Sequence, residues 1–332
     1  MNVRSIVRAD WLGLLVAVLV LAGSLASGVP QFNTEINQYV VLLNVSVTLI
    51  VAFAQMVVLA IGHMNLAVGA MGGLVAVVVG GLMESYGLPI PLAVTIGILC
   101  GALMGLMNAV VTIRTGINPF IVTLATASVY SGINLGITGA IPYYNLPAEF
   151  VAFGQARTGP IPHLFVWAIV LGIMLAVILR TTVFGRQLFA LGGNPRAAEL
   201  SGLPVNRLVI GAHVLSGVLA AIAAVLLMAR FGSGQPTIGQ NWLMPSFAGP
   251  ILGGAALEGG FVSIIGTALA SGLVALLDNG LVLAQADPFW VEFLLGALIL
   301  GAISLSRFRT LYRGRGRSRL ASAQPAARLS HP

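Results

Sequence analysis

Few side chains in this chain of 332 residues are of the types that carry out catalysis or bind metals. Cys100 is the one cysteine, and the four histidines, His63, His163, His213 and His331, lack the spacing of metal ligands. The sequence shows no signature of a nucleophile placed beside a general base. It therefore predicts neither an enzyme nor a metal site.

Lysine is absent from the chain, and all 16 positive charges are arginines. A phosphate-binding loop needs a lysine that reaches the phosphates of ATP. The chain is therefore expected to bind no cofactor, and any ATP with its Mg²⁺ must be used by a partner ATPase.

Two carboxylates, Asp278 and Glu292, lie within apolar stretches. Transporters driven by an ion gradient usually carry such ionisable groups in the middle of their spans. Both residues fall nearer the outer ends of their stretches, which favours a structural or pore-rim role. An ion-coupled secondary transporter of a small polar solute remains the alternative.

The polar segment "FGRQLFALGGNPRAAELSGLPVNR", residues 184–207, interrupts the apolar pattern. Asn194 is a good helix N-cap, Pro195 suits the first helical position, and Gly202 can end the helix in a left-handed conformation. These residues predict a helix of about two turns, Pro195–Ser201, flanked by flexible glycines.

Small residues on the surface of this helix, Ala197, Ala198 and Ser201, are typical of a docking site for a partner protein. The alternative is an ordinary connector between two spans. The docking segment predicted here comprises Gly192, Gly193, Asn194, Pro195, Arg196, Ala197, Ala198, Glu199, Ser201 and Gly202.

The composition of the chain indicates which kind of secondary structure positions these residues. With 58% hydrophobic residues, 8% charged residues and a mean hydropathy of +1.00, the chain is an integral membrane protein. A spanning helix needs about 20 apolar residues, and the alternation of a membrane β-barrel is not seen. The predicted fold is an all-α polytopic helix bundle.

About ten transmembrane helices are predicted, at residues 11–29, 39–61, 66–83, 89–113, 118–139, 162–181, 208–230, 245–257, 260–285 and 288–306. The stretch 245–257 is short and contains Pro250, so a re-entrant segment is the alternative there. For 11–29 the alternative is a cleaved signal peptide.

Arginine placement predicts the orientation. With ten spans and a cytoplasmic N-terminus, only Arg157 and Arg230 lie outside, which agrees with the positive-inside rule and puts both termini on the cytoplasmic side of the membrane. The net charge of +7 comes largely from the tail "RFRTLYRGRGRSRL", which is typical of a segment held at anionic lipid and does not indicate nucleic-acid binding.

Two halves of the chain correspond. Asn108 matches Asn279, and the spans that begin at residues 39 and 208 have nearly the same offset. The pattern predicts an inverted repeat of four spans. The predicted parts are an N-terminus with the first span (1–38), the first repeat (39–139), an external loop, connector helix and coupling loop (140–207), the second repeat (208–306) and a basic tail (307–332).

Polar residues within spans are costly unless they face protein or water. The candidates for the substrate path are Asn44, Thr123, Thr126, Asn134 and Ser216. The alternative for each is a hydrogen bond between helices.

Several segments resemble the permeases of bacterial ribose-type ABC sugar importers. They are the loop 184–207, "GHMNLAVGAMGG" at 62, "GALMGLMNAVVTIRTGINPFIVTLATASVYSGINL" at 101, "LSGVLAAIAAVLLMAR" at 215 and "ILGGAALEGGFVSIIGTALASGLVALLDNGL" at 251. The resemblance covers roughly residues 39–306. The chain departs from the family pattern at Asn65, where the family usually has a carboxylate, and at Glu258.

The resemblance implies a path for a monosaccharide or small polyol, formed with a second permease copy or a homologous permease. It also implies two ATPase subunits docked on short cytoplasmic coupling helices. An extracytoplasmic sugar-binding protein would deliver the substrate.

Overall fold

The computed structural model describes residues 3–287, 290, 293–294, 296–301 and 304. This part of the chain is predominantly helical, which confirms the all-α character of the predicted fold. Nine of the nineteen residues of the tenth predicted span, Glu292 among them, fall outside the described residues, and the basic tail falls wholly outside them.

The elements before the central loop are α1 (Val3–Gly28), the 3-10 helix η1 (Pro30–Asn33), α2 (Glu35–Leu59), α3 (Val68–Glu84), α4 (Ile90–Thr115) and α5 (Pro119–Thr138). The connecting elements are α6 (Ala148–Gln155), β1 (Arg157–Thr158), β2 (Ile161–Pro162), α7 (His163–Thr181), α8 (Val183–Gly193) and α9 (Pro195–Leu200). The last elements are α10 (Val205–Phe231), α11 (Leu243–Leu252) and α12 (Ile264–Leu283).

Local chemistry accounts for many helix ends. α5 begins where the Asn118 side chain accepts from the backbone N–H of Phe120, with Pro119 in the first helical position. α4 ends at Gly116, which takes the left-handed conformation with a φ of 67°. Such signals set the lengths of the helices, and the apolar sequence between them sets their burial.

Six of the described helices are long and apolar enough to cross a membrane: α2, α4, α5, α7, α10 and α12. α2 and α10 are 72% and 67% buried over their most apolar windows, against 28% for α4, α5 and α7. A helix that is apolar on all sides and buried belongs to the core of the bundle. α2 and α10 therefore form the centre, and the other three present apolar faces outward.

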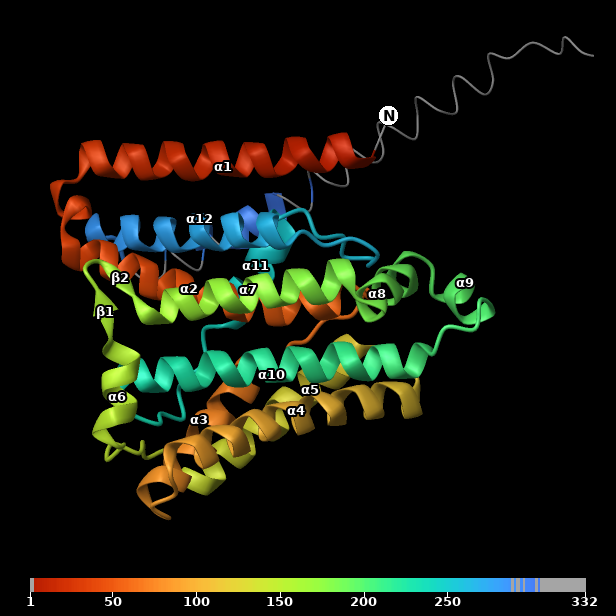
Figure 1. The fold of residues 1–332 in the computed structure, drawn as a ribbon, viewed down its shortest axis with the longest axis horizontal. Coiled ribbons are helices and arrows are strands. Elements are labelled where there is room, and N and C mark those ends of the chain that lie inside the picture. The colour runs from red at the N-terminus through yellow and green to blue at the C-terminus, as the bar shows by residue number, and fades with distance from the viewer. Residues whose placement is uncertain (1–2, 288–289, 291–292, 295, 302–303, 305–332) are drawn as a thin grey trace, which may run out of the picture.

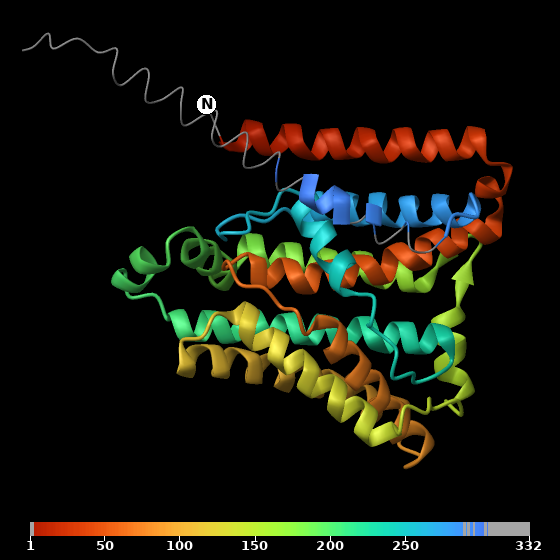
Figure 2. The ribbon, with the colours of Figure 1, turned by 180° about the vertical axis from the view of Figure 1, so that it is seen from behind.

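The long helices lie side by side, and the connecting elements gather at the two ends of the bundle (Figure 1). α10 packs against α2, α3 and α4, while α12 packs against α1, α2 and α11. α6 and the antiparallel β1–β2 pair lie at one end, called here the hairpin end. α8 and α9 lie at the opposite end, called here the α9 end (Figures 1 and 2).

Two central helices are each followed by an irregular segment and a shorter helix. α2 is followed by residues 60–67 and the 17-residue α3, and α10 by residues 232–242 and the ten-residue α11. At about 1.5 Å per residue, α11 is roughly 15 Å long, half the thickness of a bilayer core.

The two irregular segments are brought together at one crossing, where the start of α3, directly after residues 60–67, lies against residues 232–242. A Cβ built on Gly69 would collide with the carbonyl oxygen of Gly239, and one built on Gly239 would collide with the carbonyl oxygen of Gly69. The backbones therefore touch directly at this crossing. Only glycine at both positions permits so close an approach.

Candidate functional site

The predicted short helix of the central loop is present as α9. The Asn194 side chain accepts from the backbone N–H of Ala197 at 3.0 Å, and Pro195 occupies the first helical position. The helix ends at Leu200, and Gly202 follows with a φ of 75°. The capped helix is thus confirmed, one residue shorter than predicted.

The predicted flexible glycine flank is wrong at Gly192, whereas Gly193 and Gly202 are exposed. Gly192 and Gly193 form the end of α8, whose start is capped by the Thr182 side chain. A Cβ on Gly192 would collide with the carbonyl oxygen of Ala60 and the amide of Gly260. The glycine at position 192 is therefore a close-packing residue that joins the loop to the bundle.

The predicted surface of α9 also needs correction. Ala197 and Ser201 are exposed as expected, but Ala198 is 4% exposed and packs into the protein's own core. Sequence reasoning treated the three small residues alike because a six-residue helix gives too little periodicity to tell its faces apart.

Leu200 is the residue of α9 that the sequence reasoning missed. Its side chain is 83% exposed, the most exposed large apolar side chain among the described residues. Arg196 and Glu199 are exposed beside it. An apolar residue at the end of an otherwise small and polar helix was the available signal. The arrangement offers one apolar contact within a polar rim, as in many protein interfaces.

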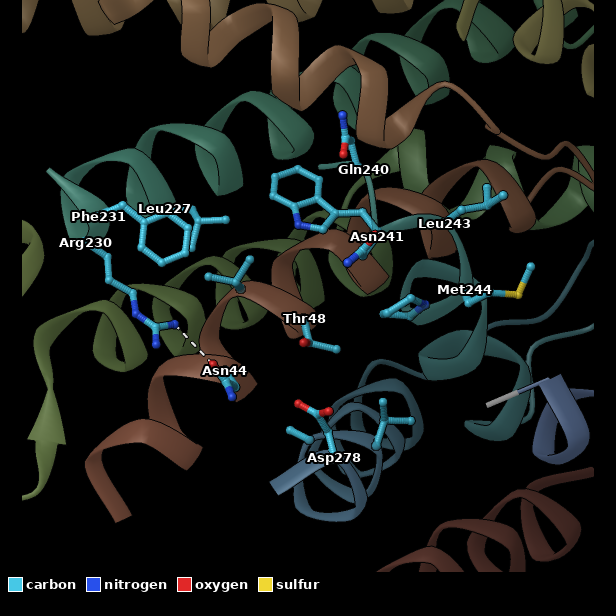
Figure 3. A pocket seen from close by; sticks show the side chains of 15 residues that line it. Asn44, Thr48, Leu227, Arg230, Phe231, Gln240, Asn241, Leu243, Met244 and Asp278 are labelled. Carbon is cyan, nitrogen blue, oxygen red and sulfur yellow. Dashed lines mark hydrogen bonds between the residues drawn. The ribbon is translucent and has the colours of Figure 1, made fainter. Parts of the chain in front are cut away.

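A cavity of about 470 Å³ lies near the hairpin end, between α2, α10, α12 and the junction of residues 232–242 with α11 (Figure 3). Its walls are formed by Asn44, Val47, Thr48, Leu227, Arg230, Phe231, Gln240, Asn241, Trp242, Leu243, Met244, Pro245, Val274, Ala275 and Asp278. This volume is within the range of about 300–1,000 Å³ that is typical of small-molecule sites.

Two residues of opposite charge face this cavity. Arg230, near the end of α10, donates from Nη1 to Oδ1 of Asn44 at 3.1 Å. Asp278, from α12, lines the same cavity, and its carboxylate lies on the side of Thr48 and Asn44 (Figure 3). The position of Asp278 agrees with the pore-rim role favoured from the sequence.

Trp242 forms a wall of the cavity. Its side chain is 8% exposed, and its ring lies against α3 at Gly72, where a Cβ would collide with ring atoms. The glycine therefore makes room for the indole. A rigid aromatic wall beside polar groups is common in sites for small polar ligands.

Of the five predicted substrate-path residues, the structure places Asn44 in the cavity. Of the other four, Thr123, Asn134 and Ser216 make contacts between elements, whereas Thr126 makes a hydrogen bond within α5. Thr123 and Asn134 of α5 bind the two irregular segments: the Thr123 hydroxyl accepts from the N–H of Leu66 at 3.1 Å, and the Asn134 amide donates to the carbonyl of Pro236 at 2.8 Å.

Ser216 and Thr126 also make hydrogen bonds, one to a distant segment and one within α5. The Ser216 hydroxyl accepts from the Asn65 amide at 3.0 Å, and the Thr126 hydroxyl donates to the carbonyl of Thr123 at 3.3 Å. The Asn65 side chain also accepts from the N–H of Ala67 at 3.0 Å, just before α3. α3 itself begins without a side-chain cap, because its N-cap residue is Ala67, and the Asn65 side chain stabilises the turn that precedes it.

A histidine pair, in which His213 is buried and His63 half-buried, lies beside Asn65 and was not expected from the sequence. Nδ1 of His63 and Nε2 of His213 are 3.1 Å apart, so one nitrogen donates to the other. The pair joins residues 60–67 to α10. Among the described residues, no group of three or more potential metal ligands accompanies it.

Comparisons with known proteins agree on one family. A family model described as "Branched-chain amino acid transport system / permease component" matches residues 37–303. The autoinducer 2 import system permease protein LsrD of Salmonella typhimurium (strain LT2) is 36% identical over 270 residues, which are 80% of this chain and 81% of that protein. LsrD of Enterobacter sp. (strain 638) is 34% identical over 313 residues, 92% of this chain and 95% of that protein.

A solved structure of a protein assigned to the metal-chelate type of ABC transporter, in an inward-facing conformation, has a similar fold. The TM-score is 0.52 and the sequence identity 18%, with 90% of this chain and 98% of that chain covered. At this identity the likeness concerns the fold alone.

Proposed function

The chain belongs to the permease-component family of the branched-chain amino acid transport systems and is a permease subunit of an ABC importer, and on that premise we propose that it forms the path for autoinducer 2 or a monosaccharide. The relatives are named for autoinducer 2 import, and ribose-type importers carry monosaccharides. The family membership confirms the resemblance seen in the sequence and does not support the ion-coupled alternative. ABC importers of this kind work with an ATPase and a substrate-binding protein.

The exposed α9 carries the proposal that the ATPase docks at this end of the bundle. Leu200 offers an apolar side chain to a partner, and Gly192 fixes α8, and with it α9, to the bundle through the Ala60 carbonyl. A helix that is capped, exposed and rigidly attached can transmit a push from a partner. ATP and Mg²⁺ are then used by that partner, and a second permease, identical or homologous, completes the path.

Ten membrane crossings with an inverted repeat of 39–139 and 208–306 are part of this proposal. Gly62 and Gly232, with φ angles of 75° and 65°, follow α2 and α10, and Gly69 and Gly239 touch each other at the crossing of the irregular segments. The two glycines of each pair are 170 residues apart in the sequence. Equivalent residues contact each other only near a two-fold axis, so the Gly69–Gly239 contact supports a repeat with such an axis.

The proposed orientation puts the α9 end and both termini in the cytoplasm and the hairpin end, with Arg157 and Arg230, outside. Single cysteines in a Cys100→Ala background test it. One at position 196 should react with an impermeant maleimide only after the membrane is opened, and one at position 157 should react in intact spheroplasts. External labelling at position 196 would contradict the orientation.

Leu200→Asp tests the docking proposal. Burying a leucine side chain contributes about 1.5–3 kcal/mol, so its loss should weaken ATPase binding by roughly tenfold to a hundredfold. The measurement is ATPase copurification with the permease, normalised to permease abundance in the membrane.

Tyr86→Asp is the matched control, because Tyr86 is 78% exposed but lies in the connection between α3 and α4, away from α9. Copurification should be unchanged in this variant. If Leu200→Asp retains full ATPase binding and transport, α9 is a connector and the docking proposal fails.

A further inference from the structure

The cavity near the hairpin end has the chemistry of a site for hydroxyl groups. Asn44, Gln240 and Asn241 provide side-chain amides, and Thr48 provides a hydroxyl. Amides and hydroxyls both donate and accept hydrogen bonds, as sugar hydroxyls do. Phe231 and Trp242 add aromatic surface, which can cover the apolar face of a ring.

Charge sets a further limit on what fits this cavity. Arg230 and Asp278 are the two charged residues among the described residues that line it, and their charges cancel. An anion would be attracted by Arg230 but repelled by Asp278. A cation would be attracted by Asp278 but repelled by Arg230. A neutral molecule with several hydroxyls can bind both groups without leaving either charge unbalanced.

The Arg230 side chain is held by a direct contact, and the position of Asp278 on α12 is held through its neighbour Asn279. The Arg230 guanidinium donates a hydrogen bond to Asn44. The backbone carbonyl of Arg230 accepts from the side-chain amide of Gln155 in α6 at 3.4 Å. Beside Asp278, Asn279 makes a reciprocal amide pair with Asn37 of α2, at 2.8 and 3.2 Å. The spacing between the two charges is therefore set by the packing of α10 and α12 against α2.

We propose that this cavity is a binding site for an uncharged, polyhydroxylated molecule, with Asp278 of α12 as hydrogen-bond acceptor and Arg230 of α10 as donor. This inference rests on the proposed function as an importer permease. It adds that the permease itself discriminates against charged analogues, through the balance of these two residues.

Three sugars of one ring skeleton test the proposal: neutral D-glucose, anionic D-glucuronate and cationic D-glucosamine. Equilibrium dialysis of each radiolabelled sugar is carried out against the permease–ATPase complex in lipid nanodiscs, without the binding protein. The wild-type chain should bind glucose in preference to both charged sugars. Asp278→Asn should raise the ratio of glucuronate to glucose affinity by about tenfold, the change that corresponds to about 1.4 kcal/mol.

Arg230→Gln should instead raise the ratio of glucosamine to glucose affinity. The double variant, in which both charges are removed, should return to a preference for glucose. This reversal separates a charge effect from damage to the fold, because a damaged cavity would lose all three sugars in every variant. Asp287→Asn is the control, since Asp287 is exposed beyond the end of α12 and should leave both ratios unchanged.

Unchanged ratios in both single variants, or no sugar binding by the wild-type chain, would overturn this assignment of the cavity. ATPase copurification with the wild-type chain is measured in the same preparations. If the ATPase does not copurify, the proposed function fails. If it does and the ratios do not shift, only the cavity assignment fails.

Discussion

The crossing of the two irregular segments predicts a large cost for any side chain at Gly239. Gly239 has a φ of 88°, and a Cβ there would collide with the backbone of Gly69. The left-handed conformation costs a non-glycine residue about 1–2 kcal/mol, and overpacking a tight contact costs about 1–3 kcal/mol. Gly239→Ala should therefore lower the free energy of unfolding by about 2–5 kcal/mol.

Gly254→Ala isolates the backbone contribution. Gly254 has nearly the same φ, 86°, but no other atom lies within 4 Å of the position its Cβ would take. Its substitution should cost only the left-handed strain, about 1–2 kcal/mol. The assay is equilibrium unfolding of both purified variants in mixed micelles, followed by tryptophan fluorescence. Equal losses in the two variants would refute the argument that the backbones of Gly69 and Gly239 are in direct contact.

Two other predictions concern buried contacts. Ala198→Arg should lower the abundance of the permease in the membrane, because the side chain at this position is buried, whereas Ala197→Arg should leave the abundance normal. The abundance of both variants is measured by quantitative immunoblots. Equal abundance would place Ala198 on the surface. Asn37→Ala and Asn279→Ala should each cost about 1–3 kcal/mol, because each leaves a buried amide unpaired. The double variant should lose less than the sum, and strict additivity in the unfolding measurement would mean that the two amides do not interact.

Local signals in the sequence were sufficient to predict α9. Its cap joins Asn194 to Ala197, three residues away, and its end depends on the conformation of Gly202. Interactions of this length are visible in any short stretch of sequence. The membrane helix bundle was equally predictable, because a mean hydropathy of +1.00 leaves lipid as the main solvent of the chain.

Contacts between distant segments were not predictable in this way. Ala197 and Ala198 are adjacent and alike in chemistry, and only the packing of the rest of the chain decides which of them is buried. The sequence marked Thr123 and Asn134 as polar residues inside a span. It did not reveal that both bind irregular backbone, in segments 57 and 102 residues away in the chain. A polar residue in a span can satisfy its hydrogen bonds in many ways, so its type alone does not locate it.

The close glycine contacts explain how the two ends of the bundle are connected. At the α9 end, Gly192 touches the backbone of Ala60, which begins the irregular segment 60–67. That segment leads into α3, where Gly69 meets Gly239, and Gly239 directly precedes the residues 240–245 that line the cavity. These are contacts of backbone with backbone, which cannot relax by a change of rotamer. The glycines are therefore part of the rigid connection between α9 and the cavity, which explains why so apolar a chain has glycine at these sites in place of larger residues.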